Sequence, residues 1–516
     1  MEKLVGIDFG ACNIKAAYWR GSDARIVRLS QNADQSYIPN VILYDLTRAG
    51  NVEQKIGDAA KNAQDPDNSV EHVKRKLEAE SWSKNIPSLQ REVSAVDAAT
   101  DIFRELSERL QKKLNCTPHE LRAIITVPVC SSGLQRSRIY QAAVAAGITV
   151  EEIITEPFAA MFSVQELLDD EERDEVVLIF DFGGSTLDLS LLRIVHEDGI
   201  RIEELASAGF PYGGIDIDTA IYTEIFAPKY DAEIREIISH DDTVGQAKTR
   251  QELRDVVTWL KEKLFEEDEE SIEHSCTFRG SAQNYTFELT CDEMTELFQR
   301  HHLREKIFDL MDELFGQTDL QKDEVTKVRP FGGTSRVKYV LDLLTEYFGA
   351  DIFDSDAYER DDDTVAGVAV GAARYFNIHE ERDDIELVID RKIPLSLGIA
   401  RGDSFVKCTD YHALGRSIRK TLTWQELRAN NCKVAVYQCF ADSESVAVGG
   451  KDGAVYVGSA VLDPTLYQEQ GNPLLEMELR DSRMLHMIFS QVQDDEIEEI
   501  ERHVIDLRGA GELQDV

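Results

Sequence analysis

Two stretches of this chain have the same pattern, and they decide its fold class. The first is VGIDFGACNIKAAYW, residues 5–19, and the second is LIFDFGGSTLDLSLL, residues 178–192. Each contains an apolar strand that ends in Asp-Phe-Gly, a short turn of small residues and a second strand. The copies lie too far apart for a solenoid repeat, so the pattern is typical of a duplicated domain.

The residues around the two copies alternate between helical and strand patterns. Residues 101–114 have apolar side chains at helical spacing, 123–128 form an apolar strand, and 153–157 predict a strand that runs into a helix with proline at its start. Residues 215–315 are expected to be mostly helical. This alternation favours an α/β architecture in which helices cover the sheets.

Composition changes near residue 380, where a charged stretch precedes the apolar segment 385–389. After Pro394, short strands alternate with turns, which indicates an all-β domain. Residues 494–506 are polar and could form one short helix. The predicted organisation is an α/β domain over 1–380, a linker over 381–393, an all-β domain over 394–505 and a tail over 506–516.

The charge of the chain excludes some classes of partner. Among 516 residues, 97 are acidic and 56 are basic, so the net charge is −41. Such a chain is repelled by nucleic acid and by anionic membranes, and neither is expected as a partner. No apolar run is long enough for a membrane span, no secretory signal precedes the first strand, and the eight cysteines form no CxxC pair. These features predict a cytoplasmic protein with reduced thiols.

Asp8 and Asp181 each end a strand just before a glycine-containing turn. If the two turns face one another, two carboxylates point into one cleft, and they need a cation between them unless one is protonated. Mg²⁺ suits this position, and the backbone amides of 10–13 and 183–186 would hold phosphates. The alternative is two ordinary hairpins with aspartates on the surface.

Three further motifs are ambiguous when each is taken alone. The Asp-Phe-Gly sequence also occurs in protein kinases, but the other kinase motifs are absent, which rejects that class. The paired glycines at 332–336 and 212–216 could let a ring or a phosphate approach, or could form simple turns. By position alone, Glu156 is better explained as an acidic residue in the first turn of a helix than as a catalytic group.

Taken together and in this order, the motifs resemble the 70-kilodalton heat-shock chaperone family (Hsp70/DnaK-type). The resemblance implies a duplicated actin-like (ribonuclease H-like) ATPase domain with two lobes around a Mg-ATP cleft, followed by a peptide-binding all-β sandwich. It extends in collinear order over about residues 1–505. The matching stretches are residues 5–13, 125–128, 154–160, 180–188, 213–218, 332–336, 369–373 and 393–399.

The resemblance also implies roles for individual residues. Asp8, Glu156 and Asp181 would surround a hydrated Mg²⁺, while Thr186 and Asp188 would lie near the γ-phosphate and the attacking water. Lys74 would orient that water, with Lys76 as the alternative if the register slips. The other implied nucleotide contacts are Gly10, Ala11, Cys12, Asn13, Gly183, Gly184, Ser185, Gly213, Gly214, Lys261, Gly332, Gly333 and Arg336.

The same resemblance implies a route between the two domains. Pro128 and Arg136 match the proline switch of the family and its arginine relay, and residues 385–389 match the interdomain linker. In the β domain, an extended peptide is expected to rest against Ile399 and residues 434–436 through main-chain hydrogen bonds and apolar pockets.

The chain departs from the family at several positions. Ala11 and Cys12 replace two threonines that bond to phosphate, so phosphate positioning should be weaker. Thr258 stands where the family has a glutamate beside adenine, and Phe265 where it has a small polar residue. The segment 84–96 is too short for the usual outer hairpin, and the helical lid that follows the β domain in the family is expected to be absent.

The expected function is therefore that of a lidless Hsp70-like chaperone with weak ATPase activity. Its expected partners are unfolded or extended peptides, a co-chaperone and a nucleotide exchange factor, and a monomer is expected. One alternative is a nucleotide-binding scaffold or regulatory protein with little or no turnover, which Ala11 and Cys12 favour. Another is an actin-like filament protein or a sugar kinase, against which the β domain argues.

Overall fold

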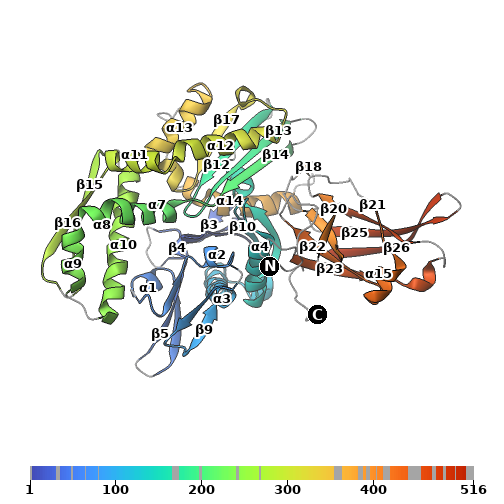
Figure 1. Cartoon of the computed structure of the whole chain (residues 1–516), viewed down its shortest axis with the longest axis horizontal. Helices are drawn as coiled ribbons and strands as arrows, with labels where there is room; N and C mark the ends of the chain where they lie inside the picture. The colour runs from blue at the N-terminus through green and yellow to red at the C-terminus, as the bar shows by residue number, and fades with distance from the viewer. Residues whose placement is uncertain are drawn as a thin grey trace.

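The fold is built from two similar mixed sheets and a pair of smaller antiparallel sheets (Figure 1). In this computed structural model, the described residues are 3–21, 23–30, 35–47, 50–63, 65–79, 81–164, 174–196, 200–239, 243–266, 269–279, 281–353, 363–381, 388–390, 396–401, 404–410, 419–439, 455–467, 472–479, 484–493 and 496–506.

The first mixed sheet contains the N-terminal Asp-Phe-Gly turn. Its central strand β1 runs parallel to β10 and antiparallel to β2, so the turn lies at the carboxyl end of β1. In spatial order the strands are β11 (Thr149–Thr155), β10 (Leu121–Val127), β1 (Lys3–Phe9), β2 (Asn13–Arg20) and β3 (Asp23–Ile26), with β4 (Ile38–Pro39) also paired to β2.

The second mixed sheet repeats this arrangement around the second Asp-Phe-Gly turn. Its strand β12 runs parallel to β17 and antiparallel to β13, as β1 does to β10 and β2. The repeated strand-turn-strand unit predicted from the sequence is therefore present in the structure. In spatial order the strands are β17 (Lys327–Phe331), β12 (Glu175–Phe182), β13 (Leu187–His196), β14 (Ile200–Phe210) and β18 (Val388–Asp390).

Helices cover both sheets and also fill the space between them. Helices α5 (Glu156–Met161) and α14 (Asp363–Glu381) pack on strands of both sheets, and Figure 1 shows α14 in the middle of the molecule. Helix α3 (Ala95–Leu114) packs behind the first sheet beside α4 (Gly133–Ala145), where Phe103 stacks on Phe9. Helix α12 (Leu303–Gly316) packs behind the second sheet, which completes an alternation of helix and sheet layers.

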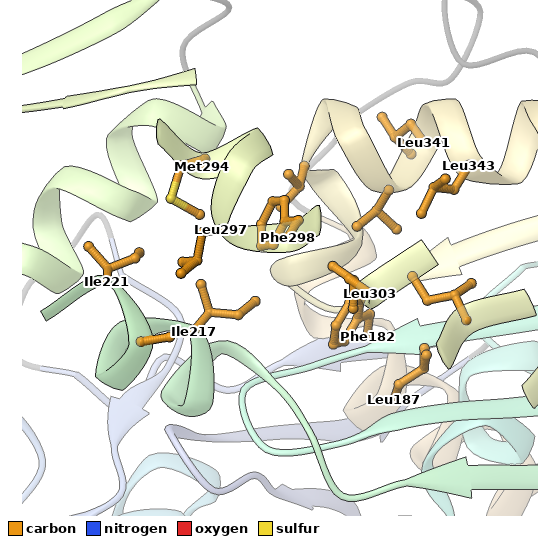
Figure 2. Close-up of a cluster of buried hydrophobic side chains, with 14 of the residues drawn as sticks. Phe182, Leu187, Ile217, Ile221, Met294, Leu297, Phe298, Leu303, Leu341 and Leu343 are labelled. Atoms are coloured by element: carbon orange, nitrogen blue, oxygen red, sulfur yellow. The ribbon is translucent and has the colours of Figure 1, made fainter. Parts of the chain in front are cut away.

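The apolar core of the second half extends directly to its turn. Phe182 and Leu187 flank that turn, and Figure 2 shows them facing Leu303 and Leu343 from the covering helices. These side chains are almost fully buried. Since each large apolar side chain contributes about 1.5–3 kcal/mol when fully buried, this packing fixes the position of the turn that follows β12.

Each half also has an outer extension. In the first half it contains β5 (Val41–Leu46), β6 (Val52–Ile56), α1 (Asp58–Lys61), β7 (Ser69–Glu71), α2 (Val73–Lys76), a short hairpin of β8 (Ser83–Ile86) and β9 (Arg91–Ser94), and η1 (Pro118–Glu120) follows α3. In the second half it contains α7 (Gly214–Ala220), η2 (Ile221–Phe226), α8 (Ala227–Lys229), α9 (Asp231–Ser239), α10 (Thr243–Glu266), β15 (Ser271–Thr277), β16 (Asn284–Thr290) and α11 (Cys291–Arg300), and η3 (Lys322–Glu324), η4 (Thr334–Arg336) and α13 (Lys338–Phe348) follow α12.

The C-terminal part is a pair of four-stranded antiparallel sheets with a shared apolar core. In spatial order, one sheet contains β20 (Ser404–Asp410), β19 (Ser396–Arg401), β22 (Lys433–Cys439) and β23 (Val455–Val461), and the other contains β21 (Arg419–Thr421), β24 (Leu474–Leu479), β25 (Met484–Gln493) and β26 (Glu496–Asp506). The short elements α15 (Trp424–Ala429) and η5 (Pro464–Leu466) lie in the connections.

The expected short helix over residues 494–506 is wrong. Residues 496–506 form β26, which pairs antiparallel with β25 along most of its length. The polar sequence suggested a solvated helix, but main-chain hydrogen bonds to β25 outweigh the weak intrinsic preference of such a segment. His503 also packs edge-on against Phe489 of β25.

The expected linker region contacts the second sheet. Residues 388 and 389 lie in β18, which pairs parallel with β14, whereas 385–387 lie outside the described residues. Strand β23 of the C-terminal part contacts helix α4 of the first half. Six cysteines are free thiols, namely Cys12, Cys116, Cys130, Cys276, Cys291 and Cys432. Among the described residues, no helix is long and apolar enough to cross a membrane.

Candidate functional site

The two Asp-Phe-Gly turns meet each other at the centre of the molecule. A Cβ atom on Gly184 would lie 2.3 Å from Sγ of Cys12, so only glycine allows the turns to approach this closely. Gly332, at a φ of 81°, leads the loop after β17 onto the same place, where a Cβ atom would lie 2.6 Å from Oδ1 of Asp181. The two Asp-Phe-Gly turns and the loop after β17 therefore come together around the buried Asp181.

A buried ion pair joins the first extension to this site. Lys74, on the short helix α2, is only 2% exposed, and its Nζ pairs with Oε1 of Glu156 at the start of α5. Gln135 fixes the backbone at this point by donating from Nε2 to the carbonyl of Lys74 at 2.9 Å. Lys76 instead lies over the ring of Trp82, so Lys74 is the lysine that reaches the carboxylates.

A second buried lysine, which the sequence analysis did not single out, pairs with the first aspartate. Nζ of Lys15 lies 2.9 Å from Oδ2 of Asp8, and the two residues are direct partners across β1 and β2. The signal was available in the sequence, because Lys15 follows Asp8 at the same spacing at which Asp188 follows Asp181.

In the second hairpin the corresponding pair consists of two acids. Asp188 is 1% exposed and lies directly across from Asp181 on β12 and β13. Its Oδ1 accepts a hydrogen bond of 2.8 Å from the backbone N–H of Val129, and its carboxylate also bonds to the side chain of Thr186. Within the described part of the chain, its Oδ2 is buried and has no hydrogen-bond partner.

Burial and mutual repulsion perturb these carboxylates. Burial, with the charges of Glu156, Asp188 and Asp8, raises the pKa of Asp181 well above its ordinary value. Burial and the charge of Glu156 raise the pKa of Asp188 to about 7. Burial also raises the pKa of Glu156, although Lys74 opposes this. Burial lowers the pKa of Lys15, but the charges of Asp8, Asp181 and Glu156 outweigh it and raise that pKa. All these groups therefore share one electrostatic environment.

The balance of charge fits a hydrated divalent cation. Four carboxylates face two ammonium groups, which leaves two negative charges uncompensated when all four acids are ionised. Among the residues that the structure describes, no three side chains of the usual ligand types are grouped closely enough to hold a metal ion directly. The excess charge and the orphaned Oδ2 of Asp188 suit Mg²⁺ that keeps its own water ligands.

The loops expected on the adenosine side are joined to each other. Nζ of the buried Lys261 lies 2.7 Å from Oδ1 of Asp218 and donates to the carbonyl of Gly214 at 3.3 Å. Thr334 donates its hydroxyl to the carbonyl of Gly183 at 2.8 Å, which ties η4 to the second turn. Thr258, which replaces the glutamate of the family, donates to Asp218 at 3.2 Å.

Three of the glycines expected to contact the nucleotide have amides that already have partners in the protein. The N–H of Gly183 donates to Thr186, that of Gly213 to Asp216, and that of Gly214 to Gly183. The second turn is therefore rigid, and phosphate donors have to come from the remaining amides and from lysine side chains.

Side chains from the first extension hold the first turn. Asn40 donates from Nδ2 to the carbonyl of Gly10 and from its backbone N–H to that of Cys12, both at 2.7 Å. Nδ1 of His72 lies 3.2 Å from the carbonyl of Ala11. Burial lowers the pKa of His72 to about 4 and raises that of the Cys12 thiol to about 11, so both are neutral near pH 7. Asn40 and His72 lie in loops, so they contributed no periodic signal to the sequence pattern.

The structure brings the expected switch residues together. Arg136, on α4, is largely buried, and its guanidinium donates to the carbonyls of Pro128 at 3.5 Å and Ser131 at 3.4 Å. Helix α4 also carries Gln135, the partner of Lys74, on its first turn. The helix that contacts β23 is therefore hydrogen-bonded to the backbone of α2, the short helix that carries Lys74.

The peptide contacts expected in the β domain are wrong for three residues. Ile399, Val434 and Val436 are buried in the core shared by the two sheets, with exposures of 3%, 5% and 0%. The backbone of β19 is bonded to β20 on one side and β22 on the other, so it has no free edge to accept a peptide strand. The apolar face of these strands packs against the other sheet of the C-terminal pair.

The comparisons with known proteins agree with this geometry. The family model described as "Hsp70 protein" matches residues 4–443, and the chain belongs to the Hsp70 family. It is 25% identical over 425 residues to a heat shock protein of Pyricularia oryzae, covering 77% of this chain and 66% of that relative. It is 28% identical over 421 residues to "Chaperone protein HscA homolog" of Pseudoalteromonas atlantica, covering 77% and 61%. The chain thus spans just under two thirds of the length of these relatives.

Proposed function

We propose that the chain is an ATP-dependent chaperone in which Mg-ATP binds between the two mixed sheets. Hydrolysis there would be coupled through residues 381–393 to a β domain, residues 394–505, that binds extended unfolded peptides. The observation that carries the proposal is the convergence of the buried pair Lys74–Glu156 with the two acidic turns.

The chemistry would depend mainly on positioning. A bound Mg²⁺ would neutralise phosphate charge and leave the rest to the protein. The Lys74 ammonium, held by Glu156, would orient an attacking water and stabilise negative charge as it develops. Asp188, whose pKa lies near 7, can accept a proton from that water, and Thr186 fixes the orientation of its carboxylate.

Coupling between the domains would follow two physical contacts. The first is the pairing of β18 with β14, which continues the second mixed sheet towards the β domain. The second is the contact of β23 with α4, the helix that carries Arg136 and Gln135. A nucleotide-dependent shift of Lys74 would move Gln135, and through α4 it would reach the β domain.

A second function is favoured by the first turn. Ala11 and Cys12 provide no hydroxyl groups, and several glycine amides are used within the protein. Nucleotide could therefore bind without efficient turnover, and the chain would then act as a scaffold or a regulatory protein.

Single-turnover ATP hydrolysis, with and without an unfolded peptide, tests the proposal. We expect the wild type to convert bound ATP to ADP, faster with peptide, and Lys74→Ala to abolish most of this conversion. Lys76→Ala is the matched control and should leave the rate nearly unchanged, since Lys76 lies on Trp82. Binding without conversion would support the scaffold function, and a failure to bind nucleotide would overturn both.

A further inference from the structure

Lys15 is the feature of the cleft that the proposed function does not use. Its side chain is 16% exposed and that of Asp8 is 6% exposed, so the ion pair between them is mostly removed from water. Placing a flexible lysine in a buried site has a large desolvation cost, and a structural ion pair seldom recovers more than that cost. A structural role alone therefore explains this lysine poorly.

The position of Lys15 is informative because of its neighbours. It lies opposite Asp8 in the strand register, and its ammonium interacts electrostatically with Asp181 and Glu156 as well as with Asp8. These are the three carboxylates that would surround the metal. The ammonium is therefore already located where the site needs positive charge.

We propose that Lys15 is a built-in cation that neutralises Asp8 and contacts the phosphates of the bound nucleotide. Nucleotide binding by this chain would then depend only weakly on a divalent cation. The inference rests on the proposed function, since it assumes that the cleft binds nucleotide.

The hydrogen-bonding capacity of the ammonium agrees with this role. An ammonium group has three donors, and within the described residues Lys15 uses one of them, donating to Asp8 at 2.9 Å. Lys15 is two residues beyond the first turn, where Ala11 and Cys12 supply no hydroxyl donors. Its remaining donors would replace that lost phosphate contact.

The proposal also separates binding from hydrolysis. Asp181 and Asp188 have no ammonium partner among the described ion pairs, and Oδ2 of Asp188 is orphaned. A hydrated divalent cation is still required on that side to neutralise them near the γ-phosphate. We therefore expect binding to persist without Mg²⁺ and hydrolysis to require it.

The test compares the affinity for a fluorescent ATP analogue in Mg²⁺ and in EDTA. For the wild type we expect the two dissociation constants to agree within about tenfold. For Lys15→Met the affinity in EDTA should fall about a hundredfold, which is the loss expected for one or two hydrogen bonds from a charged donor. In Mg²⁺ the variant should bind nearly as well as the wild type, because the metal can replace the missing charge.

A thermal-unfolding measurement without nucleotide gives an independent readout. Mg²⁺ alone should raise the melting temperature of Lys15→Met, in which Asp8 has lost its cation, more than that of the wild type. The matched control is Lys55→Met, which removes a surface ion pair to Asp45 at 2.5 Å between two other antiparallel strands. That variant should show the wild-type response to Mg²⁺ in both measurements.

The outcomes separate this inference from the proposed function. If the wild type binds nucleotide in Mg²⁺ and not in EDTA, the inference is overturned while the proposed function stands. This measurement uses the wild type alone, so it tests the inference even if Lys15→Met does not fold. If the ratio of the dissociation constants in EDTA and in Mg²⁺ is the same for Lys15→Met as for the wild type, the inference is also overturned. The ion pair between Lys15 and Asp8 would then have a structural role only. Absence of binding under both conditions would overturn the proposed function itself.

Discussion

The two hairpins at the centre of the molecule share an aspartate and the strand register beside their turns, but they differ in what faces that aspartate. Across β1 and β2, Asp8 faces Lys15, whereas across β12 and β13, Asp181 faces Asp188. The first pair is neutral and the second carries up to two negative charges. Because the scaffold is the same, one register position decides which side of the cleft requires an external cation.

The turns of the two hairpins also differ in what holds them. Asn40 and His72, from an outer extension, bond to the first turn, while backbone groups and Thr334 bond to the second. The first turn therefore depends on groups that include a titratable one. A movement of the first extension should therefore affect the first turn before the second.

The largest expected effect comes from giving the first hairpin the acidic pair of the second. Lys15→Asp would place two carboxylates opposite each other and leave Asp8 buried without a cation. We expect a loss of about 3–5 kcal/mol in the free energy of unfolding, measured by urea denaturation without divalent cations. Lys55→Asp, in a surface pair, should lose much less, because solvent screens that pair. Equal losses of unfolding free energy in the two variants would show that the buried pair contributes no more to stability than the surface pair.

The second prediction concerns the other buried lysine. Lys74→Ala should slow single-turnover hydrolysis about a hundredfold, because a group that acts on developing charge stabilises the transition state more than bound ATP. The dissociation constant for ATP should change by less than about tenfold. Equal losses in rate and affinity would instead indicate that Lys74, like Lys15 in our proposal, mainly binds phosphate.

A third variant tests the excess charge of the second hairpin. Asp188→Asn keeps the size of the side chain and removes one uncompensated buried charge, so it should stabilise the nucleotide-free protein by about 2 kcal/mol without divalent cations. Thermal unfolding at neutral pH measures this effect. Asp45→Asn, at the surface, should be close to neutral. A destabilised Asp188→Asn protein would mean that the bond from Val129 requires the ionised acid.

The smallest expected effect is a dependence of stability on pH through the first turn. In the folded chain, burial lowers the pKa of His72 to about 4, whereas an unfolded histidine titrates near 6.5. The unfolded state therefore binds the proton first, and stability falls as pH decreases through this window. By about pH 5.5 the loss should reach about 1 kcal/mol relative to neutral pH.

His72→Asn is the matched variant for this measurement. Asparagine tolerates the φ of 52° found at this position and can donate to the carbonyl of Ala11. Carboxylates titrate in both proteins, so subtracting the pH dependence of stability of the variant from that of the wild type should remove their contribution. A wild-type profile that is no steeper than that of the variant would contradict the assignment.

Much of the fold and part of the site could be predicted from the sequence. The repeated strand-turn-strand pattern gave Asp8 and Asp181 because a strand followed by a glycine turn is a local signal. The resemblance to the family pointed to Lys74 and Glu156 separately, but their ion pair was not predicted, since the two residues are distant in sequence. Lys15 was missed because a single lysine in a strand is usually interpreted as a solvent-exposed residue.

The β domain shows why the rest was harder to predict. The sequence predicted short strands here, but it did not show whether a peptide or another sheet covers their apolar side chains. In the structure, Ile399 and Val436 lie in the core between the two sheets of the C-terminal part. For β26, the polar sequence gave no periodic signal, and pairing with β25, a contact between strands, decided the structure.

The packing of α14 on β1 has a consequence for how this protein is made. Strand β1 begins at residue 3, yet α14, which covers one face of it, begins only at residue 363, and Arg374 of that helix pairs with Asp23 at 2.9 Å. At about 5–20 residues per second, a ribosome needs roughly 20–70 s to synthesise the chain between them. During that time the first sheet presents an uncovered apolar face, so a member of a chaperone family is itself aggregation-prone while it is being translated.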